Sequence, residues 1–172
     1  MIGITVHTRS EARPFWQWVD RAAALEAVSS IRALGYPPHL TLARYDDLSP
    51  AILNEALALF AREAPVSLIF DRIGLFDVDP LVVWLSPRHD DRLIALHAKI
   101  HATIRPALCD PHYRPGQWIP HLTLATAIPA NRRVDALALA AERVEPFELV
   151  FDRAESVAWP PLRVLETVQL SG

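Results

Sequence analysis

Two histidine–threonine pairs are the residues of this sequence whose types and spacing could do chemistry. The hexapeptide Pro-His-Leu-Thr-Leu-Ala occurs at positions 38–43 and again, unchanged, at positions 120–125. Two imidazoles with pKa values near neutrality can act together as a general base and a general acid. Two threonine hydroxyls can donate hydrogen bonds to an anion. The repeat therefore predicts a site for acid–base chemistry on an anionic group.

Each copy of the hexapeptide alternates polar and apolar side chains, which is the period of a half-buried β-strand. On such a strand His39 and Thr41 point to one face, and the leucines between them point to the other. His121 and Thr123 are arranged in the same way in the second copy. A duplicated packing unit could also produce the repeat, but packing would tolerate Val or Tyr in place of the histidines. We therefore interpret the four polar residues as functional.

The repeat extends beyond the hexapeptide. Phe-Asp-Arg occurs at 70–72 and again at 151–153, an offset of 81 residues against 82 for the hexapeptide. The alternating apolar residues of 66–70 also match those of 147–151 at this offset. This agreement predicts a duplicated chain with two similar lobes.

The elements that must position these residues form two similar successions of strands and helices. We predict strands over 2–8, 38–45, 66–72, 81–85, 120–124, 147–152 and 163–170, and helices over 14–34, 50–60, 87–104 and 131–144. Ser49-Pro50 and Ser86-Pro87 are read as helix starts, and Gly35 as a helix end. No linker of changed composition separates the halves. We expect one α+β domain over 1–172, in which two pseudo-twofold-related lobes place antiparallel sheets beside a central cleft, with helices outside.

The bulk composition sets limits on partners and location. A chain of 172 residues with 51% hydrophobic content suits one well-packed domain. The formal net charge of -3 argues against a long nucleic acid duplex as the partner, and leaves a nucleic acid end or a small anionic ligand. One cysteine, Cys109, fits a reducing compartment, and the sequence has neither a signal peptide pattern nor a membrane-spanning stretch. We expect a cytoplasmic monomer without membrane contact.

The segment from Asp110 to Trp118 is the one long irregular stretch, and it runs straight into the second hexapeptide. Loops on a rigid scaffold tend to carry recognition residues. Tyr113, Arg114 and Trp118 are therefore candidates for stacking a base or steering a phosphate. The alternative, that this loop only covers the edge of the core, stays equally open.

Three further histidines, at positions 7, 97 and 101, are interpreted as structural. His97 and His101 lie four residues apart on a predicted helix, which is a spacing that a metal ion could use. No acidic residue or third histidine accompanies them at helical spacing, and His7 lies alone on the first strand. We predict no metal site at these positions.

Paired His-x-Thr-x strands in a duplicated α+β chain of this size resemble the 2H phosphoesterase superfamily. That group includes RNA 2′,3′-cyclic phosphodiesterases and 2′-5′ RNA ligase-like proteins, and the resemblance spans the whole chain. It implies that His39 and His121 are catalytic and that Thr41 and Thr123 bind phosphate. Because an arginine shortly after a motif strand assists in some members, the resemblance also makes Arg44 a candidate.

The resemblance and the chemistry together predict an enzyme. We expect metal-independent hydrolysis of a 2′,3′-cyclic phosphodiester, on an RNA end or a small cyclic nucleotide, to a 2′-phosphate. Neither hexapeptide carries the carboxylates of a two-metal phosphoesterase, so no cofactor is expected. The resemblance implies that His121 activates water and His39 protonates the leaving 3′ oxygen. Two alternatives stay open, namely 2′-5′ RNA ligase activity and a nucleotide-binding module without turnover.

Overall fold

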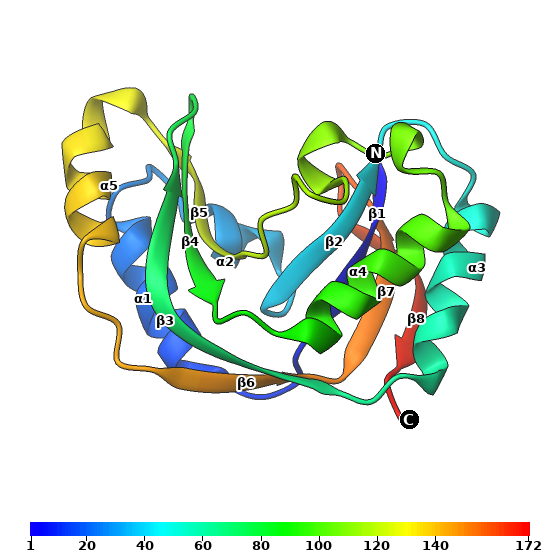
Figure 1. Cartoon of the computed structure of the whole chain (residues 1–172). Helices are drawn as coiled ribbons and strands as arrows, with labels where there is room; N and C mark the ends of the chain where they lie inside the picture. The colour runs from blue at the N-terminus through cyan, green and yellow to red at the C-terminus, as the bar shows by residue number, and fades with distance from the viewer.

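Two four-stranded antiparallel sheets make up the computed structural model, which describes residues 1–172 (Figure 1). The first sheet contains, in spatial order, β2 (His39–Tyr45), β1 (Ile2–His7), β7 (Arg153–Ala158) and β8 (Arg163–Gln169). The second sheet contains β5 (Leu122–Ile128), β4 (Leu81–Pro87), β3 (Val66–Phe76) and β6 (Phe147–Phe151). The two motif strands, β2 and β5, are each the edge strand of their sheet. The predicted α+β architecture with two lobes is confirmed.

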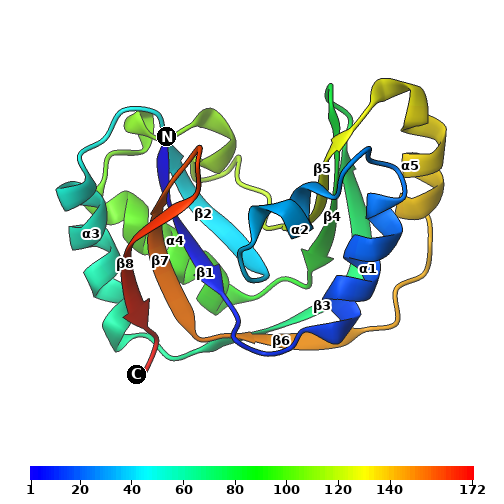
Figure 2. The same cartoon turned by 180° about the vertical axis from the view of Figure 1, so that it is seen from behind.

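Helices cover the outer faces of the two sheets (Figures 1 and 2). Helices α3 (Pro50–Ala58) and α4 (Asp91–Thr103) pack on the first sheet, and α1 (Arg13–Ala23) and α5 (Arg133–Ala140) pack on the second. Helix α2 (Ser30–Leu34) packs beside the edge strand β5 and lies between the lobes in Figure 2. Four short 3-10 helices complete the fold, namely η1 (Leu59–Arg62), η2 (Pro106–Leu108), η3 (Pro111–Tyr113) and η4 (Ala130–Arg132). None of the helices combines the length and the apolar character that crossing a bilayer requires.

The pairing of β3 with β6 reveals the pseudo-twofold axis. Residues 66–70 pair antiparallel with 147–151, and these are the segments that the sequence repeat equates. Leu68 lies directly opposite Leu149, its own counterpart in the repeat. Two equivalent segments can pair about equivalent residues only if a twofold axis passes between them. Both strands run beneath the two lobes in Figures 1 and 2 and join them.

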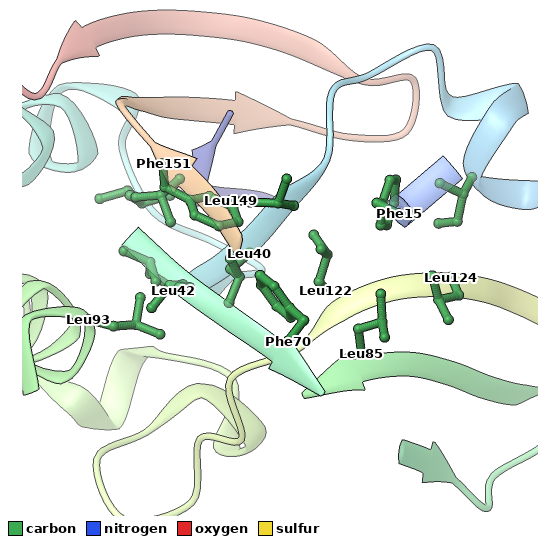
Figure 3. Close-up of a cluster of buried hydrophobic side chains, with 14 of the residues drawn as sticks. Phe15, Leu40, Leu42, Phe70, Leu85, Leu93, Leu122, Leu124, Leu149 and Phe151 are labelled. Atoms are coloured by element: carbon green, nitrogen blue, oxygen red, sulfur yellow. The ribbon is translucent and has the colours of Figure 1, made fainter. Parts of the chain in front are cut away.

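The leucines of both hexapeptides lie in one shared core. Leu40, Leu42, Leu122 and Leu124 are all fully buried, within a cluster of 38 buried apolar residues that spans both lobes (Figure 3). Burying one leucine side chain contributes about 1.5–3 kcal/mol. The apolar face of each motif strand therefore fixes the strand firmly, and the alternation leaves the histidine and the threonine on the opposite face.

The helix predicted over 14–34 is divided into α1 and α2. The carboxylate of Glu26, in the connecting segment, accepts hydrogen bonds from the backbone N–H groups of Thr126 and Ala127 at 3.0 and 2.7 Å. The connection therefore leaves the helical path in order to cover the free edge of β5. The predicted helix end at Gly35 is confirmed, because this residue has φ of 61° and closes α2.

Other elements also differ from the prediction, and strands β3 and β5 extend to Phe76 and Ile128, beyond the predicted ends at 72 and 124. Helix α4 begins at Asp91 rather than after Ser86-Pro87, because the Asp90 carboxylate caps it while Pro87 still pairs with β3. Strand β7 was not predicted, since Glu155 and Ser156 are buried polar residues that hide its apolar pattern. Helix α5 covers only Arg133–Ala140 of the predicted 131–144.

Candidate active site

The two motif histidines are held in the same way. His39 begins β2 and His121 directly precedes β5. The Nδ1 atom of His39 lies 2.9 Å from the Pro37 carbonyl oxygen, and that of His121 lies 2.7 Å from the Ile119 carbonyl oxygen. Since a carbonyl can only accept, Nδ1 carries the hydrogen in each ring. Each Nε2 atom is therefore the one left to take or give a proton.

The two motifs face adjoining cavities. His121 and Thr123 line a cavity of about 650 Å³, and His39 and Thr41 line one of about 180 Å³. Arg44 and Tyr113 line both, so the two cavities meet at these residues. Neither threonine hydroxyl has a hydrogen-bond partner within the chain, and both are free to donate to a ligand. The structure thus brings the four motif residues to one divided cleft.

Arg44 lies at the junction, beside the Asp110 carboxylate. Its Nε atom is 3.5 Å from the Asp110 carboxylate, and it is buried without a hydrogen-bond partner. The side chain is 35% exposed, so part of the guanidinium is accessible from the cleft. The backbone N–H of Asp110 donates to the Arg44 carbonyl at 2.9 Å and docks the loop there. A guanidinium held in this way can bind a phosphate oxygen.

Two of the loop candidates lie outside the cleft. The Arg114 guanidinium donates to the Cys109 carbonyl at 2.9 Å and to a second carbonyl of the same loop. The Trp118 indole donates to the Thr41 carbonyl at 3.1 Å, and its ring stacks on His97 with centroids 4.2 Å apart. Neither side chain lines a cavity of the cleft. Trp118 holds the loop against β2, whereas Arg114 bonds only to carbonyls of residues 107–109. Only Tyr113 of the three candidates lines the cleft.

His97 and His101 form a structural pair, in agreement with the sequence interpretation. Their Nε2 atoms lie 2.8 and 3.0 Å from the same acceptor, the carbonyl oxygen of Tyr113. Burial lowers the pKa of His97 to about 4 and also lowers the pKa of His101. The pair therefore supports the loop that carries Tyr113. No group of three or more His, Cys, Asp or Glu side chains is arranged to hold a metal ion.

Aromatic residues that the sequence analysis did not single out support the two catalytic candidates. The Tyr36 ring lies edge-on to His39 with centroids 4.8 Å apart, and the Phe76 ring lies edge-on to His121 at 5.2 Å. Tyr36 precedes His39 by only three residues, so its position in the sequence was a signal that it could lie near this histidine. Phe76 comes from the far end of β3, and no local sequence signal connects it to His121.

Burial changes the proton affinity of both imidazoles. It lowers the pKa of His39 to about 4, with smaller lowering by the charges of His121 and His7, while the Pro37 carbonyl raises it. Burial likewise lowers the pKa of His121, against the effect of the Ile119 carbonyl. Both rings are therefore neutral at pH 7 while the cleft is empty. An anion bound between them favours the protonated forms.

A sequence profile described as the 2′-5′ RNA ligase superfamily matches residues 12–160. The chain belongs to this superfamily. This superfamily is that of the 2H phosphoesterases. A search of curated protein sequences finds no significant match.

Solved structures share the fold of this 2H phosphoesterase superfamily member. A protein described as a phosphoesterase is 19% identical with a TM-score of 0.63, over 99% of this chain and 98% of that one. TT0787 of Thermus thermophilus is 22% identical with a TM-score of 0.62, over 99% and 98%. E. coli LigT complexed with 3′-AMP is 21% identical with a TM-score of 0.60, over 99% and 98%. At these identities the likeness shows the fold alone.

Proposed function

We propose that this 2H phosphoesterase superfamily member hydrolyses 2′,3′-cyclic phosphodiesters to 2′-phosphates without a metal ion. The observation that carries the proposal is the pair of equivalently held imidazoles, each with a free Nε2 and a free threonine hydroxyl beside it, in one divided cleft. We also propose that residues 1–172 work as one monomeric unit. The cytoplasmic location stays a prediction, which the free, buried thiol of Cys109 supports.

The geometry supports an in-line displacement at phosphorus. One imidazole takes a proton from water as the new P–O bond forms, and the other gives a proton to the ester oxygen as its bond to phosphorus breaks. Thr41, Thr123 and Arg44 donate to the non-bridging oxygens, where negative charge grows in the transition state. The superfamily resemblance assigns water activation to His121 and protonation of the 3′ oxygen to His39.

The proposed substrate is a small nucleotide or an RNA end. E. coli LigT has been crystallised with 3′-AMP, NADP+ and ATP, which supports small nucleotides as ligands of this superfamily member also. The cavity of about 650 Å³ has room for a nucleoside, and Phe76 and Tyr113 give it aromatic walls. The net charge of -3 supports the expectation that a long duplex is not bound.

The test is an assay with 2′,3′-cyclic mononucleotides and cyclic-ended oligonucleotides, with products identified by phosphorus NMR. We expect 2′-phosphates, at a rate that EDTA does not change, since no three-ligand cluster is present to hold a metal ion. Loss of activity in EDTA would contradict the metal-free mechanism. Binding without turnover would identify the chain as a nucleotide-binding module.

A 2′-5′ RNA ligase is the second candidate, and the division of the cleft favours it. Because Arg44 and Tyr113 separate two cavities, a phosphate at the junction has space on either side for an attached group. In the ligase reaction a 5′-hydroxyl replaces water and attacks the cyclic phosphate. Adding an excess of an oligonucleotide with a 5′-hydroxyl tests this candidate. A 2′-5′-linked product would establish it, and unchanged hydrolysis would exclude it.

A further inference from the structure

A buried polar network lies beside His39 and has no counterpart beside His121. His7 of β1 lies directly opposite His39 of β2, and Glu155 of β7 lies opposite Thr5, two residues before His7. Residues that lie opposite one another on antiparallel strands point their side chains to the same face. The network and the catalytic imidazole therefore share one face of the first sheet.

Glu155 is the centre of this network. Its side chain is only 10% exposed, and one carboxylate oxygen accepts the hydroxyl of Tyr36. The other oxygen accepts the Thr167 hydroxyl at 3.0 Å and lies 3.2 Å from His7 Nε2. Two hydroxyl groups, one on each oxygen, donate to this side chain as they would to a carboxylate, and the His7 ring lies beside one of the oxygens. A buried negative charge thus lies behind the catalytic face.

Tyr36 connects this charge to His39. Its phenol gives its one hydrogen to Glu155, so the Thr5 hydroxyl, 2.8 Å away, donates to the phenol oxygen. Burial and the Glu155 carboxylate raise the pKa of Tyr36, which keeps the phenol protonated. With both hydrogen bonds in place the ring is fixed, and it is this ring that lies edge-on to His39. The Pro37 carbonyl and the Tyr36 ring together hold the imidazole.

The second lobe offers His121 an apolar support instead. His121 packs against Phe76 at 5.2 Å and Trp84 at 5.9 Å between ring centroids. The Trp84 indole packs directly over Gly74, where a Cβ would come within 2.3 Å of the ring. Asp77 lines the wider cavity, but it is paired with Arg133. No carboxylate contributes to the pKa of His121.

We propose that Glu155 is a positioning residue for His39, which stabilises the protonated imidazole and, through Tyr36, fixes its orientation. The proposal rests on the proposed function and adds to it, because it distinguishes two histidines whose motifs are identical. Consistent with it, the Glu155 charge raises the pKa of His39, in opposition to burial.

Glu155 is the only carboxylate that contributes to the pKa of His39. The other titratable or charged groups near His39 come from every element around it. They are His7 on β1, Arg153 opposite His7 on β7, Tyr36, His121, Arg44 and Tyr113. All of them are retained in a Glu155 variant. A change in the titration of His39 in that variant can therefore be assigned to the carboxylate.

Proton NMR of the histidine rings tests the proposal without any substrate. The His39 resonance is identified by its loss in His39→Ala and is titrated in wild type, Glu155→Gln and Glu166→Gln. Glu166→Gln is the matched control, because it removes an exposed carboxylate from the neighbouring strand β8. We expect Glu155→Gln to lower the pKa of His39, and the control to leave it unchanged. An unchanged pKa in Glu155→Gln, or an equal shift in the control, would overturn the proposal.

Kinetics on a 2′,3′-cyclic nucleotide give a second readout. A fall in the pKa lowers the protonated fraction of His39, and with it kcat at neutral pH, by about tenfold for each pH unit of the fall. We expect KM to stay the same, the pH optimum to move down, and Glu155→Asp to recover most of the activity. A loss that is equal at every pH would show a merely structural role. If wild type turns over no substrate, the proposed function fails, while the titration still decides the role of Glu155.

If Glu155→Gln does not fold, Tyr36→Phe takes its place in the titration. This variant keeps the ring against His39 and removes the hydroxyl that partly neutralises the carboxylate. The pKa of His39 is then expected to rise, opposite in sign to the effect of Glu155→Gln. A pKa that does not move would equally overturn the proposal.

Discussion

At the scale of single residues, two identical motifs meet different surroundings. His39 and His121 each bind the carbonyl two residues before them, and this contact depends only on the local chain. What lies behind each ring comes from other strands, so the sequence of the motif does not control it. Glu155 and Tyr36 support one ring, and apolar aromatic side chains support the other.

Replacing either histidine should remove most of the turnover. We expect His39→Ala and His121→Ala each to lower kcat by about 10²–10⁴-fold, the usual contribution of general acid–base catalysis. His89→Ala is the matched control, because this exposed imidazole lines neither cavity of the cleft. A nitrophenyl phosphodiester, whose leaving group needs no proton, should separate the roles. On it His39→Ala should lose far less activity than His121→Ala, and equal losses would contradict the assignment.

The pH dependence should show both depressed pKa values. The productive form carries one proton on the pair, so kcat/KM is bell-shaped and reports the free enzyme. Above both pKa values no proton donor is left, and below both no base is left. Burial lowers the pKa of His39 to about 4 and lowers that of His121. Since both then lie below the ordinary value of about 6.5, the maximum should lie on the acid side of pH 6.5. A maximum at or above pH 7 would contradict this account.

At the scale of elements, the loop over 110–118 both attaches to β2 and contributes a side chain to the cleft, and its sequence does not show which residues serve which role. Its backbone and the Trp118 indole attach it to β2, while Tyr113 reaches the cleft. Which side chains of an irregular segment point inward depends on where its backbone docks. Here the docking points are carbonyls of the motif strand, at Thr41 and Arg44.

Substitutions at Tyr113 and Trp118 should therefore differ in kind. If Tyr113 stacks a base, Tyr113→Ala should raise KM for nucleotides by an amount equivalent to about 1–3 kcal/mol, with a smaller change in kcat. Trp118→Phe should mainly lower the melting temperature, because it removes the hydrogen bond to Thr41 while keeping a ring against His97. Thermal melts and kinetics on both variants check this. A KM effect confined to Trp118→Phe would reverse the assignment.

The alternation of polar and apolar residues predicted most strands and the polar faces of the motif strands, and Gly35 predicted a helix end, because these signals are local in the sequence. Strand β7 escaped prediction because Glu155 and Ser156 are buried polar residues, which make sense only with their partners on other elements. Ser86 and Asp90 could each cap the start of α4. The helix begins after Asp90, because the carboxylate of this residue accepts hydrogen bonds from two backbone N–H groups of the first turn. The support behind each histidine could not be predicted, since it depends on strand order.

At the scale of the whole molecule, the two halves of the chain interleave. The first sheet takes β1 and β2 from the N-terminal half and β7 and β8 from the C-terminal half. The first helix of the chain, α1, packs on the second sheet beside β5. Neither half has a complete sheet without the other, so the fold should be lost as one unit.

Acid should destabilise this unit well above the pH at which its carboxylates titrate. The folded pKa values of His39 and His97 are about 4, against about 6.5 in the unfolded chain. Between these values the unfolded state binds more protons, so stability is complete above pH 6.5 and falls as the pH decreases towards 4. Each group contributes at most about 1.4 kcal/mol per pH unit.

Urea unfolding at pH 7, 6 and 5 measures this loss. His97→Gln keeps a donor for the Tyr113 carbonyl but removes one titrating ring, so its stability should fall less steeply with pH than that of wild type. Equal slopes for the two proteins would contradict the contribution of His97.

The matched contacts of His39 with Pro37 and of His121 with Ile119 have a consequence for the direction of catalysis. A phosphodiester is itself nearly symmetric about phosphorus, with one ester oxygen on either side. When the reaction runs backwards, the ring that gave a proton takes one and its partner gives one, so the same site serves both directions by exchanging roles. No residue of the cleft can then favour ring opening over ring closure. The direction is set by the equilibrium of the overall reaction, and therefore by whether water or another hydroxyl group attacks phosphorus.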